Sequence, residues 1–87
     1  MSPKQLEAFA DIIDADLVIT RYGNQAGRWT CSFRSADVKK GSLLGGLYGE
    51  GKSPLEAMKT YAGLIAGELL VFNAAGGERR REYRVPA

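Results

Sequence analysis

The sequence contains no histidine, and its single cysteine is Cys31. Without an imidazole group the chain cannot build a Ser-His-Asp or Cys-His hydrolase site, and it lacks the usual ligand of zinc enzymes. One cysteine cannot form an intramolecular disulfide or a cysteine-rich zinc site. We therefore expect a protein that is not an enzyme and that uses no metal and no other cofactor.

The sequence also lacks an apolar run long enough to span a bilayer or to act as a secretory signal, so the expected location is the cytoplasm, with no membrane partner. It has 87 residues, of which 45% are hydrophobic and 25% charged. These values are typical of a soluble globular domain. At this length one core buries only about 60% of the unfolded surface. We expect one α+β domain over residues 1–87, for which dimerisation would add stability.

Residues 46–53 match the G-x-x-x-x-G-K-[ST] pattern of phosphate-binding loops. Pro54, however, favours extended geometry in the residue before it. Ser53 is therefore better suited to be the N-cap of a helix, with Pro54 in the first turn and Glu56 completing a capping box. The later apolar strand ends in Asn73 and not in the acidic residue that such enzymes use to hold magnesium. We favour a capped helix over a nucleotide site.

A first helix is predicted to begin at Pro3, because Ser2 suits the N-cap and Gln5 can return the capping hydrogen bond. The apolar residues at helical spacing form one stripe, which consists of Leu6, Phe9, Ala10 and Ile13. We expect this stripe to lie on a sheet.

Residues 17–22 predict the first strand and residues 23–27 a hairpin loop. Residues 28–34 alternate strictly, as in a half-buried strand. The side expected to be buried holds Trp29, Cys31 and Phe33. The candidate exposed sheet face holds Arg28, Thr30, Ser32 and Arg34. On this interpretation Cys31 is a small core residue and not a nucleophile.

The polar residues 35–42 are predicted to form a loop, and residues 43–48 a third strand. Gly45, Gly46 and Gly49 are unusual for a strand. We interpret them as positions where a helix packs closely on the sheet, with contact to a ligand as the alternative.

A second helix is predicted over residues 54–68. Its expected core face consists of Leu55, Met58, Tyr61, Ala62, Ile65 and Leu69. Gly63 and Gly67 lie one turn apart, and we interpret them as a notch for a strand or a partner helix. A strand at 70–73, a turn at 75–77 and a last strand at 80–85 complete the chain. The predicted fold is an α-β-β-β-α-β-β two-layer sandwich, with helices on one face of an antiparallel sheet.

The predicted order resembles the α-β-β-β-α double-stranded-RNA-binding domain, and residues 49–53 followed by Ala57 look like the start of that family's second helix. The resemblance implies phosphate contacts by lysines near this helix, which are Lys52 and Lys59 here. A second resemblance is to the HicB-type antitoxin core, whose helix commonly opens as residues 53–57 do. It implies neutralisation of a toxin through a protein contact. The layout and the residues after Leu70 are also similar to small uncharacterised phage or prophage proteins.

Two functions remain open. The first is a non-catalytic interaction protein, of phage or prophage origin, that binds a protein partner through its exposed sheet face or its last strand. An unpaired edge strand would also provide a route to a homodimer.

The second function is nucleic-acid binding by the basic C-terminal strand. The charge is uneven, because the N-terminal segment is acidic, with Glu7, Asp11, Asp14 and Asp16. The candidate contacts at the other end are Arg79, Arg80, Arg81, Tyr83 and Arg84, where Tyr83 is available for base stacking. Alternation along the strand predicts Arg80 and Arg84 on one face and Arg79, Arg81, Tyr83 and Val85 on the other.

Overall fold

The computed structural model describes residues 1–21 and 27–87, and these residues form two α-helices, one short 3-10 helix and seven strands. In chain order the elements are α1 (Pro3–Ile13), β1 (Leu17–Arg21), β2 (Trp29–Phe33), β3 (Ala36–Lys40), β4 (Leu43–Gly45), β5 (Gly49–Gly51), α2 (Pro54–Ile65), β6 (Leu69–Phe72), η1 (Gly77–Arg79) and β7 (Arg81–Arg84). The predicted α+β class is confirmed. In this described part no helix is long and apolar enough to cross a membrane.

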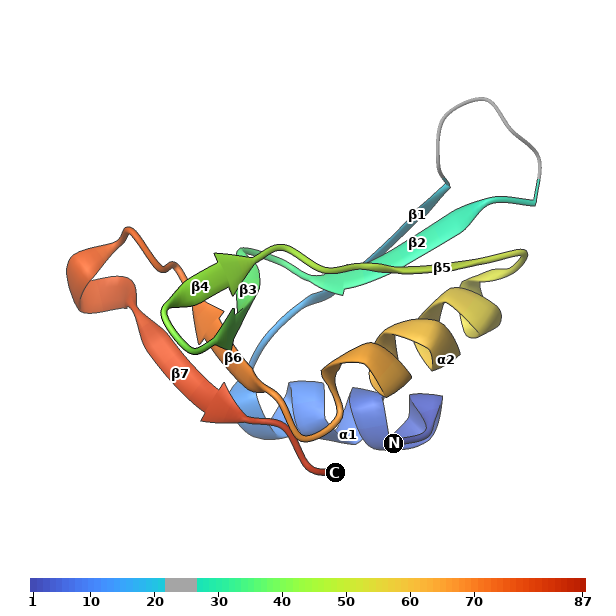
Figure 1. Cartoon of the computed structure of the whole chain (residues 1–87). Coiled ribbons are helices and arrows are strands. Elements are labelled where there is room, and N and C mark those ends of the chain that lie inside the picture. The colour runs from blue at the N-terminus through green and yellow to red at the C-terminus, as the bar shows by residue number, and fades with distance from the viewer. Residues whose placement is uncertain (22–26) are drawn as a thin grey trace.

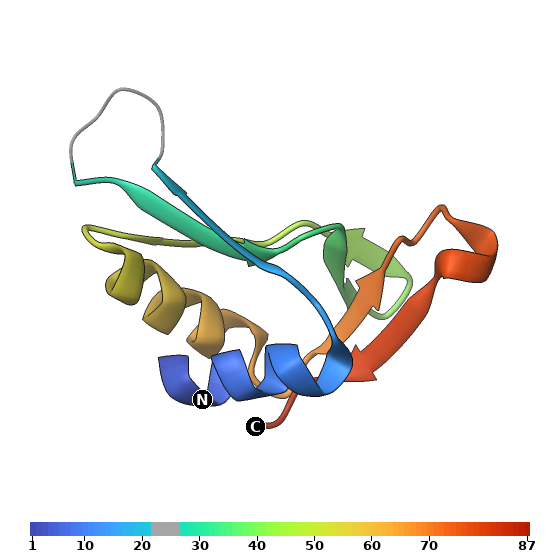
Figure 2. The same cartoon turned by 180° about the vertical axis from the view of Figure 1, so that it is seen from behind.

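All strand pairs are antiparallel, but the strands form two sheets and not the predicted single one. The first sheet has the order β1-β2-β5 and the second the order β4-β3-β6-β7. Both helices lie on the same side of the first sheet, and α2 runs along β5 (Figure 1 and Figure 2). The chain turns from β2 into β3 at Ser35, whose φ of +60° is left-handed.

The prediction of a loop at residues 35–42 is wrong, because β3 occupies most of it. In β3 only Ala36 and Val38 alternate with polar residues, and Lys39-Lys40-Gly41 follows, so the alternation is too short to predict a half-buried strand. Pairing on both sides makes β3 a strand. Val38 lies opposite Leu70 of β6 and opposite Gly45 of β4.

The predicted third strand at residues 43–48 is confirmed for residues 43–45 and wrong for residues 46–48, since β4 ends at Gly45 and β5 begins at Gly49 in the other sheet. Gly41 and Ser42 form the two-residue turn between β3 and β4. Gly41 has a φ of +62° and Ser42 does not have a positive φ, as expected for a type II′ hairpin turn. The uncharged residues 46–48 then carry the chain from one sheet to the other.

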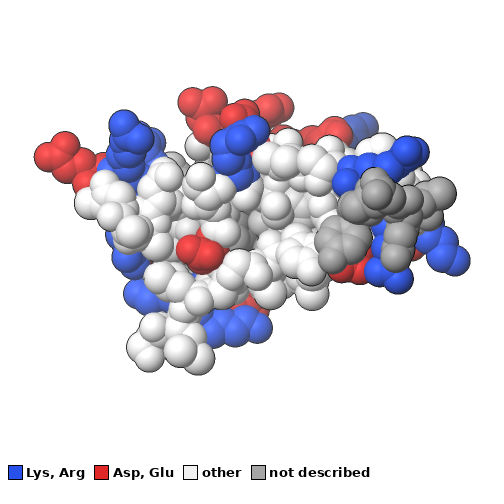
Figure 3. Space-filling view, turned by 90° about the horizontal axis from the view of Figure 1, so that it is seen from above, with Lys and Arg blue, Asp and Glu red and all other residues white. Residues whose placement is uncertain are grey.

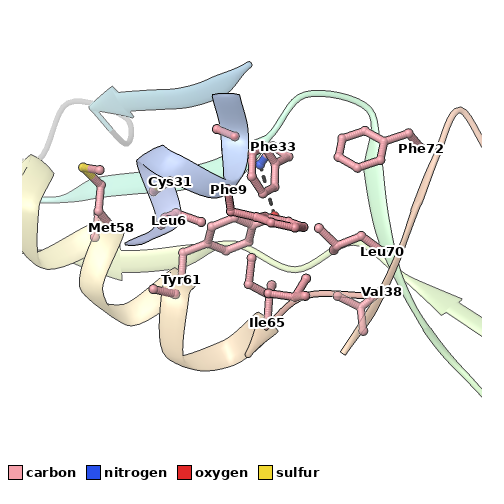
Figure 4. Packing of buried hydrophobic residues seen from close by; sticks show 14 residues of the cluster. Leu6, Phe9, Cys31, Phe33, Val38, Met58, Tyr61, Ile65, Leu70 and Phe72 are labelled. Carbon is pink, nitrogen blue, oxygen red and sulfur yellow. Dashed lines mark hydrogen bonds between the residues drawn. The ribbon is translucent and has the colours of Figure 1, made fainter. Parts of the chain in front are cut away.

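The core is centred on Phe33, which joins both sheets to both helices (Figure 4). Its ring lies edge-on to three aromatic rings, with centroid distances of 6.2 Å to Phe9, 5.9 Å to Tyr61 and 5.7 Å to Phe72. Edge-to-face pairs of this kind add about 0.5–1.5 kcal/mol each beyond their buried area. One continuous core therefore joins both helices to both sheets.

The helix starts agree with their predicted caps. The Ser2 side chain accepts a hydrogen bond from the Gln5 backbone N–H, and the Gln5 side chain accepts one from Ser2 N–H, at 3.2 and 2.7 Å. The Ser53 side chain accepts one from Glu56 N–H at 3.1 Å. Among the described residues, the Glu56 carboxylate accepts no hydrogen bond from the Ser53 backbone N–H. This half of the second predicted capping box is therefore wrong.

The predicted core faces of the helices are largely confirmed. On α1, Leu6, Phe9 and Ala10 are buried, and Ile13 packs against the core. On α2, the buried residues include Met58, Tyr61, Ala62 and Ile65. Leu55 is the exception at 64% exposed, because it lies in the first turn on the outer side of the helix. The helix ends at Ile65, and Leu69 belongs to β6.

Close packing of α2 on the sheet depends on Gly49 and Gly51 of β5. A Cβ atom at Gly49 would overlap the backbone of Ala57 and Tyr61, and one at Gly51 would lie 2.5 Å from the Ala57 nitrogen. The close-packing interpretation therefore holds for Gly49. It is wrong for Gly45 and Gly46, where a Cβ atom would meet nothing closer than 3.6 Å.

The predicted notch of Gly63 and Gly67 is not present. A Cβ atom at Gly63 would meet no atom within 4 Å, so nothing lies against this position. Gly67 lies beyond the end of α2, with a left-handed φ of +75° that turns the chain toward β6. The predicted hairpin loop at 23–27 lies outside the described residues, apart from Gly27.

Candidate interaction surfaces

The sheet edge at β4 is formed by an uncharged stretch of the chain. β4 has β3 on one side, and no strand formed by residues 1–21 or 27–87 lies on its other side. Residues 41–49 contain neither a charged residue nor a proline. Natural edge strands are usually protected from pairing with other chains by lysine, proline or a bulge. β4 itself carries no lysine or proline.

Large apolar side chains are exposed along this edge. Leu43 is 74% exposed and Tyr48 is 50% exposed, and Leu44 and Leu47 are also exposed. A hollow of about 350 Å³, which we call the β4 groove, is lined by Val38, Lys40, Leu43, Leu44, Gly45 and Leu47. Seen from above, a broad uncharged area of the molecule surrounds one acidic group, and the other charged side chains lie around the margins of this area (Figure 3). An exposed apolar patch of this kind marks an interaction site more often than an isolated leucine does.

The opposite edge of the same sheet has a different character. β7 consists of Arg81, Glu82, Tyr83 and Arg84, and Pro86 follows it. The edge of the first sheet at β1 ends in Arg21, and the hollow beside it is lined in part by Glu7, Asp11 and Asp16. Both edges therefore carry the charges that discourage strand addition, whereas β4 does not.

The candidate exposed sheet face is spread over the length of β2. Arg28 lies at one end, where its guanidinium is 3.8 Å from the Glu50 carboxylate. Thr30 lies in the middle and shares a 3.0 Å hydroxyl–hydroxyl hydrogen bond with Thr20. Arg34 lies at the far end, after the strand. The two arginines therefore lie at opposite ends of β2 and are not neighbours. The other two residues of this face, Thr30 and Ser32, form a short polar strip between them.

The basic C-terminal residues are divided among different contacts. Arg80 lies 3.1 Å from the Glu82 carboxylate and donates to the Ala74 carbonyl. Arg84 donates to the carbonyl of Gly67 at 3.2 Å. Tyr83 packs edge-on against Phe72, with 5.9 Å between centroids, so its ring belongs partly to the core.

Three of the candidate contact residues line another hollow. Arg34, Arg81 and Tyr83 line a concavity of about 370 Å³ between the end of α1 and the second sheet. Asp14, Ser35 and Asn73 line it too, and they are the only non-glycine residues with positive φ in the described part of the chain. Among described residues, neither arginine forms an ion pair within 4.0 Å. Asp14 and Asp16 nevertheless reduce the positive potential there.

Among the described residues, Cys31, Tyr61 and the metal-ligating side chains do not form a reactive site. Burial raises the pKa of the Cys31 thiol to about 11, and the residue is fully enclosed, so the thiolate needed for nucleophilic chemistry is disfavoured. Burial likewise raises the pKa of Tyr61, although the hydrogen bond from Phe33 opposes the shift. No cluster of metal-ligating side chains occurs among the residues described.

The sequence does not predict the β4 groove, because the strand pattern at residues 43–48 does not indicate whether the strand is internal or at an edge. The signal that could have revealed it is the run of nine uncharged residues with three leucines at 41–49. A paired internal strand and an exposed edge have the same local sequence. Only the neighbouring strands distinguish them.

Comparisons with known proteins identify no relative of this chain. No family model, no curated protein and no solved structure matches the chain. The resemblance to double-stranded-RNA-binding domains, the resemblance to HicB-type antitoxins and the phage or prophage origin stay predictions.

Proposed function

We propose that this chain is a non-catalytic interaction protein that binds a protein partner at the β4 edge and the β4 groove. The observation that carries the proposal is the contrast between this uncharged, leucine-rich edge and the charged edge at β7. A free edge offers backbone donors and acceptors to an extended segment, and neighbouring apolar hollows receive its side chains. The β4 edge provides both features within residues 41–48.

In β4 the backbone of Leu44 and the side chain of Leu43 would make different contacts with a partner. Lys40 and Leu43 flank a two-residue turn, so they form the hydrogen-bonded pair that closes the hairpin. The next residue, Leu44, then directs its N–H and C=O away from β3 toward the open side. A partner strand would bond to Leu44, while its apolar side chains would cover Leu43 and Leu47.

The proposal can be tested by photocrosslinking in cells that express the chain. A benzophenone amino acid would replace Leu43 or Leu47, and in a control it would replace Leu55, whose exposed fraction lies between those of Leu43 and Leu47 and which lies on α2. We expect discrete adducts from positions 43 and 47, and their loss when Leu44→Lys is added. Equal labelling from all three positions, or no adduct from 43 and 47, would overturn the proposal.

A second candidate function is nucleic-acid binding, because Arg34 and Arg81 line one hollow and form no ion pair with a described residue. Their guanidinium groups would contact phosphates, and binding would weaken as salt is raised. The test is a salt titration with duplex and single-stranded RNA and DNA. It compares R34A/R81A with K52A/K59A, which removes the same charge from Lys52 before α2 and from Lys59 within α2. A loss only in R34A/R81A supports this site, and a loss only in K52A/K59A contradicts it.

A further inference from the structure

The β4 edge is suited to pair with a second copy of itself, and this inference rests on the proposed interaction function. We propose that two copies of this chain associate through antiparallel pairing of β4 with β4 about a two-fold axis at Leu44. The pairing would join two four-stranded sheets into one continuous sheet. Three features of the edge support a copy of the chain as its occupant.

The first feature is charge. In a two-fold pairing the same edge of each copy lies against the other, so a strand that carries charges of one sign repels its copy. Residues 41–49 have no charge to repel. A self-pairing of β7 would instead bring Arg81 and Arg84 of two copies together.

The second feature is the backbone. Leu44 directs its N–H and C=O to the open side of β4, as argued above from the turn at Gly41 and Ser42. Placing the axis at Leu44 lets each copy donate this N–H to the Leu44 carbonyl of the other. The result is one closely spaced hydrogen-bonded pair, and it leaves the bonds between β3 and β4 intact.

The third feature is the space around Gly45. With Leu44 opposite Leu44, the antiparallel register puts Leu43 of one copy opposite Gly45 of the other. Leu43 is the most exposed residue of the patch, and a Cβ atom at Gly45 would meet no atom within 4 Å. The leucine of each copy therefore has free space over the glycine of its partner. Leu43 would then be covered in a way that the single chain cannot provide.

The short ladder makes the association weak. β4 has three residues, so the interface lies below the roughly 1,200 Å² that separates standard from small interfaces. We expect a dissociation constant in the high micromolar range and a monomer in dilute solution.

The first test is the mass of the whole chain in solution, measured by sedimentation equilibrium from about 10 µM to about 1 mM. We expect the mass to rise toward twice that of the monomer. Gly45→Val places a side chain in the space needed by Leu43 of the other copy, and its Cβ atom would meet nothing within 4 Å in its own chain. We expect it to weaken association at least tenfold. Gly63→Val is the matched control, because Gly63 also faces open space.

A second substitution tests self-pairing without changing Gly45. Leu44→Lys places two ammonium groups at the axis and should also weaken association at least tenfold, whereas Leu55→Lys should not. A wild-type monomer at every concentration, or a dimer that survives both Gly45→Val and Leu44→Lys, would overturn self-pairing. A wild-type monomer that still gives crosslinked adducts with another protein from position 43 would overturn self-pairing alone. Absence of every adduct would overturn the proposed function itself.

Discussion

The hydroxyl group of Tyr61 accepts a hydrogen bond from the backbone N–H of Phe33 at 3.1 Å, inside the core. The bond fills a gap in the first sheet. β5 pairs with β2 only from Trp29 to Cys31, so the N–H of Phe33 has no strand on that side. The side chain of α2 thus replaces the missing ladder bond where the chain leaves for the second sheet.

Tyr61→Phe should destabilise the protein by about 1–3 kcal/mol, because it leaves the buried Phe33 N–H without an acceptor while keeping the ring. Urea unfolding followed by circular dichroism would measure the change. Tyr48→Phe is the matched control, since Tyr48 is exposed, and it should change the free energy of unfolding by less than about 0.5 kcal/mol. Equal effects of the two substitutions would contradict the role of the bond.

Gly49→Ala should be strongly destabilising, because its Cβ atom would overlap the backbone of Ala57 and Tyr61. Overpacking of this kind costs about 1–3 kcal/mol or more. The melting temperature should fall by about 4–8 °C for each kcal/mol in a domain of this size. Gly45→Ala, which faces open space, is the control and should leave the melting temperature nearly unchanged. A similar fall in both variants would show that loss of a glycine in itself is responsible.

Stability should decrease between about pH 9 and pH 11 in a way that depends on Cys31. Burial raises the pKa of the folded-state thiol from 9.0 to about 11, so above pH 9 the unfolded chain loses this proton more readily than the folded chain. The unfolded state then binds fewer protons, and the free energy of unfolding falls by up to about 1.4 kcal/mol per pH unit. Urea unfolding at several pH values would measure the slope. Cys31→Ala should have a shallower slope, and an unchanged slope would refute the assignment.

Ser53→Ala should lower the free energy of unfolding by about 1 kcal/mol, because the Ser53 hydroxyl caps the backbone of α2. The exposed turn residue Ser42 provides the control, and Ser42→Ala should have little effect. Thermal unfolding with and without magnesium and ATP would at the same time test the phosphate-loop pattern. We expect no shift with ATP, and a shift abolished by Lys52→Ala would instead support a nucleotide site.

The local elements of this fold can be predicted from short stretches of the amino-acid sequence. Ser2 and Ser53 mark the helix starts because a helix N-terminus needs an acceptor for its free N–H groups, and that need is local. The alternation of residues 29–33 likewise predicts which side chains of β2 are buried, since side chains along a strand point to opposite faces. These predictions depend on neighbours within a few residues.

Only the tertiary structure decided how the strands are shared between two sheets and which edge is left open. β3 is a strand because β6, more than thirty residues later, pairs with it. Leu43 is exposed because β4 has no second neighbour, although its sequence would suit a paired strand equally well. Strand pairing joins residues that are distant in the chain, so local periodicity does not contain it. The candidate interaction surface follows from that pairing.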